Sequence, residues 1–128
     1  MRGALPDDRY LEWFVDTFLG EHFPEAFCVD RAMLLDMHAN GLRYARHFGF
    51  VERPDQTHFL ALMNDIGPDF WRFPGFSDII NQQDLAPDRR ISLVYADVTG
   101  AQFEVAVMQQ DPLYWFPHQV QNHVLGMS

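Results

Sequence analysis

Apolar residues recur every three or four positions through much of the chain, the spacing that places side chains on one face of an α-helix. This pattern predicts a first helix over residues 7–20 and a second, longer helix over residues 30–48. Asp30 can cap the second helix, because its carboxylate can accept hydrogen bonds from the first backbone amides, and Gly49 suits the helix end. Gly41 lies inside this helix, so either another element approaches closely there or the helix is bent. The sequence leaves both alternatives open.

A third helix is predicted from about Asp55 to a stop at Gly67 and Pro68. One face of this helix carries the apolar residues Phe59, Leu62, Met63 and Ile66. After the stop, a structural corner is expected to form against the second helix, anchored by Phe70, Phe73 and Phe76. Trp71 and Arg72 are interleaved between these anchors and are expected to point outward. The segment is therefore predicted to organise the core rather than to carry chemistry.

The second half of the chain gives two competing patterns. Residues 76–83 predict a short helix, and Pro87 followed by Asp88 favours the start of another. Over residues 91–109, part of the apolar spacing fits a helix, but the β-branched residues and a Thr-Gly turn also fit a β-hairpin. The predicted fold class is mainly α, a compact bundle of about four to five helices, with a short β-hairpin near residues 91–109 as the alternative.

Composition indicates one folded domain spanning residues 1–128, because 48% of the residues are hydrophobic and 15% are aromatic. The formal net charge is −9 and the chain contains no Lys, so nucleic acid and membrane surfaces are disfavoured as partners. A basic protein partner is consistent with this charge, although the charge can also serve solubility alone. Cys28 is the only cysteine, which rules out an internal disulfide. With neither a signal peptide nor a membrane-spanning segment evident, the chain is expected in the cytoplasm.

Motifs for catalysis or metal binding are absent from the sequence, including a phosphate-binding loop, a cysteine pair, H-E-x-x-H and G-x-S-x-G. His118 and His123 are five positions apart, which places them on different faces of a helix. Cys28 stands between apolar neighbours and is expected to be a small buried hydrophobe. Asp65 and Asp69 have helical spacing, but the predicted helix stop lies between them. We therefore expect no enzymatic activity, no catalytic or metal-ligating residues and no cofactor.

An ordered series of apolar, turn and charged positions covers roughly residues 45–98. Its members are Ala45 with Phe48-Gly49-Phe50, Asp55, Phe59 with Leu62-Met63, Gly67 with Phe70, Pro74, and Leu85 with Pro87 and Arg90. This series resembles a pattern in small bacterial proteins encoded beside type VI secretion effectors. The resemblance implies a mainly helical domain, a helix from Pro87 to Val98, and a role in binding a secreted toxin as an immunity protein or accessory factor. It implies no catalytic residues, and it does not extend to the C-terminal segment FEVAVMQQDPLYWFPHQVQ.

The predicted function is therefore non-enzymatic binding of a protein partner, a cognate effector or toxin, with the oligomeric state left open. The predicted contact residues are Trp71, Arg72, Asp111, Tyr114, Trp115, Phe116 and His118. The C-terminal aromatics fit equally well as side chains that fold back into the core. A second hypothesis is a small-molecule-binding or weakly catalytic domain with a pocket lined by Trp71, Phe73, His58 and Met63.

Overall fold

The computed structural model describes residues 5–117, which form helices and turns without any β-strand. The N-terminal arm consists of α1 (Asp7–Trp13), the π-helical segment η1 (Phe14–Leu19), α2 (Gly20–His22) and the 3-10 turn η2 (Pro24–Cys28). The remaining elements are α3 (Arg31–His47), α4 (Arg53–Asp65), η3 (Phe70–Arg72), α5 (Phe76–Ile80), α6 (Pro87–Asp97), α7 (Gly100–Gln109) and η4 (Pro112–Trp115). The predicted mainly α bundle is confirmed.

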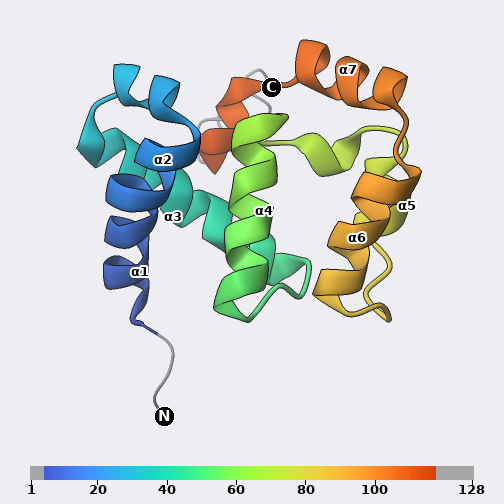
Figure 1. Cartoon of the computed structure of the whole chain (residues 1–128), viewed down its shortest axis with the longest axis horizontal. Helices are drawn as coiled ribbons and strands as arrows, with labels where there is room; N and C mark the ends of the chain where they lie inside the picture. Colours follow the sequence, from blue (N-terminus) through green and yellow to red (C-terminus); the bar gives the residue numbers. More distant parts are fainter. Residues whose placement is uncertain (1–4, 118–128) are drawn as a thin grey trace, which may run out of the picture.

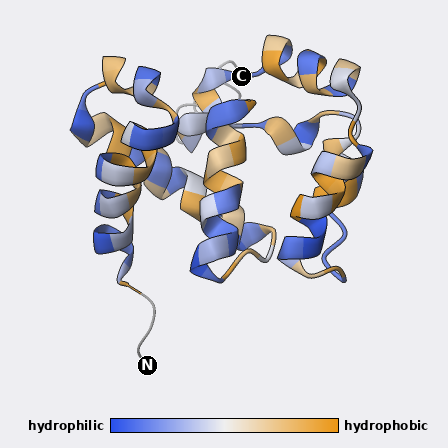
Figure 2. Cartoon of the chain, viewed as in Figure 1, coloured by the Kyte–Doolittle hydropathy of each residue, from blue (hydrophilic) through white to orange (hydrophobic). Residues whose placement is uncertain are grey.

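The helices are arranged around a central pair, α3 and α4. The arm made by α1 and α2 lies on one side of this pair, and α5 and α6 lie on the other (Figure 1). Helix α7 runs across one end of the molecule, and η4 returns from it toward α3. Hydrophobic and hydrophilic stretches alternate along the helices (Figure 2), as expected for elements with one buried face. No helix in the described part of the chain combines the length and apolar character needed to cross a bilayer.

Glycine permits the close packing of α3 on α4. Asp30 caps α3 as predicted, because its carboxylate accepts a hydrogen bond from the Met33 amide at 3.0 Å. A Cβ atom on Gly41 would lie 2.6 Å from Leu60 Cδ2 and 3.0 Å from Met63 Sδ. The close approach of α4, the first of the two alternatives left by the sequence, therefore accounts for this glycine.

Phe70, Phe73 and Phe76 are buried at the corner after α4 as the sequence predicts, but the contact shown with the second helix (α3) is made by Trp71, whose ring lies 4.7 Å from that of Tyr44. Helix α4 ends at Asp65, and Phe59, Phe70 and Phe76 are fully buried. The ring centroid of Phe70 lies 5.1 Å from that of Phe59 and 5.8 Å from that of Phe76. Phe73 is also buried. These contacts join α4, η3 and α5 into one hydrophobic core.

The β-hairpin alternative for residues 91–109 is wrong, because both parts of this segment are helical. The helix predicted from Pro87 is α6. Helix α7 begins at a capping box in which the Thr99 hydroxyl accepts a hydrogen bond from the Gln102 amide and the Gln102 side chain accepts one from the Thr99 amide. This local pairing satisfies the first amides of a helix and prevails over the β propensity of the valines that follow.

A buried arginine ties three segments together. Arg90 is 1% exposed, and its guanidinium donates hydrogen bonds to the carbonyls of Phe48 at 2.7 Å, Ile80 at 2.8 Å and Leu85 at 3.1 Å. The carbonyls of Phe48 and Ile80 belong to the ends of α3 and α5, where the helix dipoles are negative. The guanidinium also lies 4.7 Å from the centroid of the Phe50 ring. Arg90 therefore connects α6 to two other helices.

Candidate functional site

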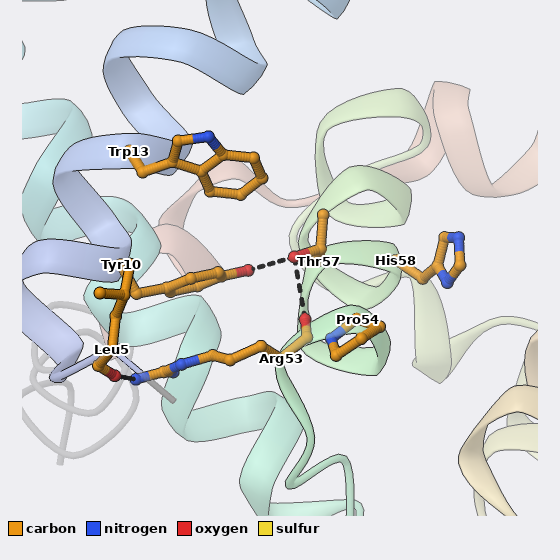
Figure 3. A pocket seen from close by; sticks show the side chains of 7 residues that line it. All are labelled: Leu5, Tyr10, Trp13, Arg53, Pro54, Thr57 and His58. Carbon is orange, nitrogen blue, oxygen red and sulfur yellow. Dashed lines mark hydrogen bonds between the residues drawn. The ribbon is translucent and has the colours of Figure 1, made fainter. Parts of the chain in front are cut away.

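An open groove between α1 and α4 has a volume of about 520 Å³. Its lining consists of Leu5, Tyr10, Trp13, Arg53, Pro54, Thr57 and His58. Figure 3 shows that Tyr10 and Trp13 project from α1 toward α4, because residues three apart lie on the same side of a helix. We call this cavity the α1–α4 groove.

Hydrogen bonds fix the inner wall of the α1–α4 groove. The Thr57 hydroxyl donates to the Arg53 carbonyl at 2.9 Å, so its oxygen accepts the proton of the Tyr10 hydroxyl at 2.6 Å. Burial raises the pKa of Tyr10, which keeps the phenol protonated and able to donate. This chain of bonds joins α1 to α4 and holds the two helices at the spacing that leaves the groove open.

The arginine that lines the groove, Arg53, is already bonded to other side chains of the protein. Arg53 lies 4.4 Å from the centroid of the Tyr10 ring and donates to Asp7 at 2.9 Å and to Gln56 at 2.7 Å. Arg46 donates to both carboxylate oxygens of Asp7, at 2.6 and 2.8 Å. Hydrogen bonds from Arg46, supported by Arg53, lower the pKa of Asp7 to about 2. The groove therefore presents mainly aromatic and apolar surface, which suits an uncharged side chain or ring.

Four of the predicted contact residues lie around one buried carboxylate. Asp69 is fully buried, and one of its oxygens accepts hydrogen bonds from the Arg72 side chain at 2.6 Å and from the Asp111 amide at 3.0 Å. The Arg72 guanidinium lies 4.7 Å from the Tyr114 ring centroid, and the Trp71 ring centroid lies 6.4 Å from that of Tyr114. The structure therefore brings these residues together in a cluster that joins η3 to η4.

The remaining predicted contact residues are placed differently. Trp115 is buried against His38, with 5.0 Å between the ring centroids, and Phe116 is half-buried. The prediction that Trp71 points outward is wrong, because its half-buried ring packs inward at 4.7 Å from that of Tyr44 and 5.7 Å from that of Phe59. The Arg72 side chain is 41% exposed, as predicted. His118 lies outside the described residues. The aromatic tail thus folds back onto the core in large part, which was one of the two alternatives left by the sequence.

Other sequence predictions are changed by the structure. Cys28 is exposed, so the prediction that it is a small buried hydrophobe is wrong, because η2 turns it toward solvent. The residues of the predicted pocket are not gathered around one cavity. Met63 and Phe73 are core residues, and His58 is at the rim of the α1–α4 groove. Within residues 5–117, no group of three or more potential ligands is arranged to hold a metal ion.

His38 is a buried histidine whose hydrogen bonds suit the neutral ring. Its Nδ1 donates to the Leu34 carbonyl at 2.7 Å, and its Nε2 accepts from the Asn64 amide at 3.0 Å. The ring lies between Phe14 and Trp115, at centroid distances of 5.1 and 5.0 Å. Burial lowers the pKa of His38 below its usual value of 6.5.

We predict that this histidine makes the protein less stable in acid. Because the unfolded chain binds a proton near pH 6.5 and the folded chain resists it, the free energy of unfolding should fall as pH drops below 6.5. The slope from one such group is at most about 1.4 kcal/mol per pH unit. Urea unfolding of the wild type and of His38→Gln between pH 7.5 and 5 measures the difference. Parallel pH profiles would show that His38 does not titrate differently on folding.

The sequence analysis did not predict the α1–α4 groove, and it did not predict that Asp69 and Arg90 are buried. The spacing of Tyr10 and Trp13 was a signal for the groove, since it places two aromatic rings on the same side of the first helix. Their partner Thr57 is distant in sequence, and no local pattern links it to them.

The chain matches no protein-family model, no curated protein and no solved structure.

Proposed function

We propose that this protein is a non-enzymatic protein-binding module that accepts an apolar or aromatic side chain of its partner in the α1–α4 groove. The observation that carries this proposal is the construction of the groove itself. Its walls are aromatic and apolar, its hydroxyl groups are hydrogen-bonded to each other, and its arginine is ion-paired. A partner side chain that binds in such a cavity is stabilised mainly by the burial of apolar surface.

The accessible edge of the groove has the character of a protein-binding hot spot. Trp13 is 41% exposed and Leu5 is 51% exposed, although both are large apolar residues. Tryptophan and tyrosine dominate binding energy at protein interfaces, because they bury large areas with few rotatable bonds. The position of Trp13 at the groove therefore makes it the residue on which partner binding should depend most.

We further propose that the partner is a secreted antibacterial toxin, with this chain as its immunity protein or accessory adaptor. Support for this step comes from the resemblance of residues 45–98 to small bacterial proteins encoded beside type VI secretion effectors. The net charge of −9 favours a basic partner, since opposite charges accelerate association and orient the encounter. The proposal places the complex in the cytoplasm of the producing cell.

The test is co-expression with the product of the neighbouring gene, which this proposal expects to be the effector. We expect the wild-type chain to restore growth and to co-purify with the effector. Trp13→Ala should weaken the complex by tenfold or more, because it removes the largest exposed contact of the groove. Phe27→Ala is the matched control, since Phe27 is 46% exposed on η2 and does not line the groove. Thermal melts of both variants verify that they remain folded.

Three outcomes would count against parts of this proposal. Equal killing with and without the chain, with no complex, would exclude the toxin-binding function. A stable complex without rescue of growth would favour an adaptor over an immunity protein. A complex that is unaffected by Trp13→Ala would place the interface away from the α1–α4 groove.

A second candidate function is binding of a small aromatic molecule in the same groove. Its support is the volume of about 520 Å³, which falls within the range of about 300–1,000 Å³ typical of small-molecule sites. Titration of the protein with indole tests this candidate. Binding is followed by the changes in the NMR chemical shifts of the backbone amides. Saturable shifts at Tyr10, Thr57 and His58 would favour it, whereas unchanged spectra at millimolar indole would remove its support.

A further inference from the structure

Helix α7 carries an apolar face that no described element covers. Val105 is 41% exposed and Met108 is 76% exposed, and with Ala101 they form a stripe at positions i, i+4 and i+7. A shallow cavity of about 140 Å³ lies along this stripe, lined by Pro74, Ala101, Gln102 and Val105. We call the stripe and the cavity the α7 face. Helix α7, which carries this face, lies at one end of the molecule, away from the N-terminal half of α1 (Figure 1).

The other side of α7 is firmly attached to the domain, so the α7 face is a fixed surface. Ala106 is fully buried, and the ring of Phe103 packs edge-on against that of Phe76 at 5.0 Å. The Gln110 side chain donates to the Ile66 carbonyl at 2.9 Å. The capping box at Thr99 holds the start of the helix. A partner can therefore bind this face without paying to order the helix first.

The part of the chain that contains α7 carries only acidic formal charges. No Lys or Arg occurs after Arg90, whereas this part of the chain contains Asp97, Glu104 and Asp111. Arg72, which precedes Pro74, is paired with the buried Asp69 at 2.6 Å. An apolar stripe with acidic neighbours is complementary to a surface with an apolar centre and basic edges.

We infer that the α7 face binds a cationic amphipathic helix of a protein partner. A helix fits because the stripe from Ala101 to Met108 extends about 10 Å along α7, roughly two helical turns over which the side chains of a second helix can pack. Met108 is suited to such a contact, since its flexible thioether adapts to different partner side chains. A second copy of this chain is disfavoured, because its own α7 face would bring like charges together. The α7 face shares no lining residue with the α1–α4 groove.

Three synthetic peptides of roughly 18 residues, long enough to form helices, test the inference. One is an amphipathic helix of Leu and Lys, the second has the same composition in scrambled order, and the third replaces Lys by Glu. We expect only the first to bind the full chain with micromolar affinity, and to bind more weakly as salt is raised. Fluorescence anisotropy of the labelled peptides measures the binding.

Substitutions locate the binding on the α7 face. Val105→Lys and Met108→Lys should each weaken binding of the Leu/Lys peptide by tenfold or more, because each adds a positive charge to the stripe. Met108 is 76% exposed, so its substitution should leave the fold intact. Val51→Lys is the matched control, since Val51 is 65% exposed between α3 and α4 and the charge change is identical.

Each alternative occupant gives a different result. Equal binding of the scrambled peptide, or equal loss with Val51→Lys, would show attraction to the acidic protein as a whole and would overturn the inference. A wild-type dimer that Val105→Lys converts to a monomer would identify a second copy as the occupant. Binding that appears only after Leu125→Asp would identify residues 118–128 as the occupant. No binding at low salt would also overturn the inference, while leaving the groove proposal untouched.

Discussion

Replacing Arg90 by Ala is expected to lower the free energy of unfolding by about 3 kcal/mol or more, because it breaks a buried hydrogen-bond network. Arg90 is 1% exposed and connects α6 to the ends of α3 and α5. Its removal deprives the carbonyls of Phe48, Ile80 and Leu85 of their charged donor. An unsatisfied buried polar group costs about 1–3 kcal/mol, and water entering the cavity left by the side chain would recover part of that cost. Chemical unfolding at neutral pH measures the difference.

Two neighbouring variants make this prediction specific. Arg89→Ala removes the same charge from an exposed position on the same helix, so its effect should be within about 0.5 kcal/mol. Arg90→Lys keeps the charge but lacks the planar fork that reaches several carbonyls, and it should lie between the wild type and Arg90→Ala. Equal stability of Arg89→Ala and Arg90→Ala would contradict the proposed role of Arg90 as a connection between helices.

Local signals in the sequence were sufficient to predict the helices whose ends carry distinctive residues. Asp30 and Gly49 bound the second helix, and the helix stop at Gly67 ends the third, because caps and turns depend on a few neighbouring residues. The segment that became α7 was ambiguous for a related reason. Its valines favour a strand, while the pair Thr99 and Gln102 forms a capping box that favours a helix. The capping box outweighs the strand preference, because it satisfies the first backbone amides of the helix.

The contacts that build the candidate site depend on residues far apart in the chain and were not predicted. Tyr10 bonds to Thr57 across 47 positions, and the Asp69 carboxylate accepts the amide of Asp111 across 42 positions. Buried arginines are rare, so the burial of Arg90 could not be inferred from a single sequence. Periodicity identifies the buried face of a helix, but it does not identify which helix covers that face.

Truncating Phe70 to Ala is expected to cost about 3–5 kcal/mol of unfolding free energy, the range found for a fully buried phenylalanine. Phe70 is 0% exposed, and its ring contacts those of Phe59, Trp71 and Phe76 at centroid distances of 5.1, 5.4 and 5.8 Å. These rings come from α4, η3 and α5, so the cavity left by the substitution would open at the junction of three elements. A thermal melt should show a midpoint lower by about 10 °C or more.

Phe27→Ala separates the effect of this corner from the general effect of removing a phenyl ring. Phe27 is 46% exposed, so the same atoms are lost with little change in buried area, and the unfolding free energy should fall by less than about 1 kcal/mol. If Phe70→Ala melted at the wild-type temperature, the corner would have to repack around the lost ring. Because Phe70 adjoins Trp71 and the buried Asp69, such repacking would also move the cluster of Arg72 and Tyr114. A stable Phe70→Ala variant should therefore show altered fluorescence from Trp71, whereas an unchanged melting temperature and unchanged fluorescence together would mean that the ring does not hold this corner.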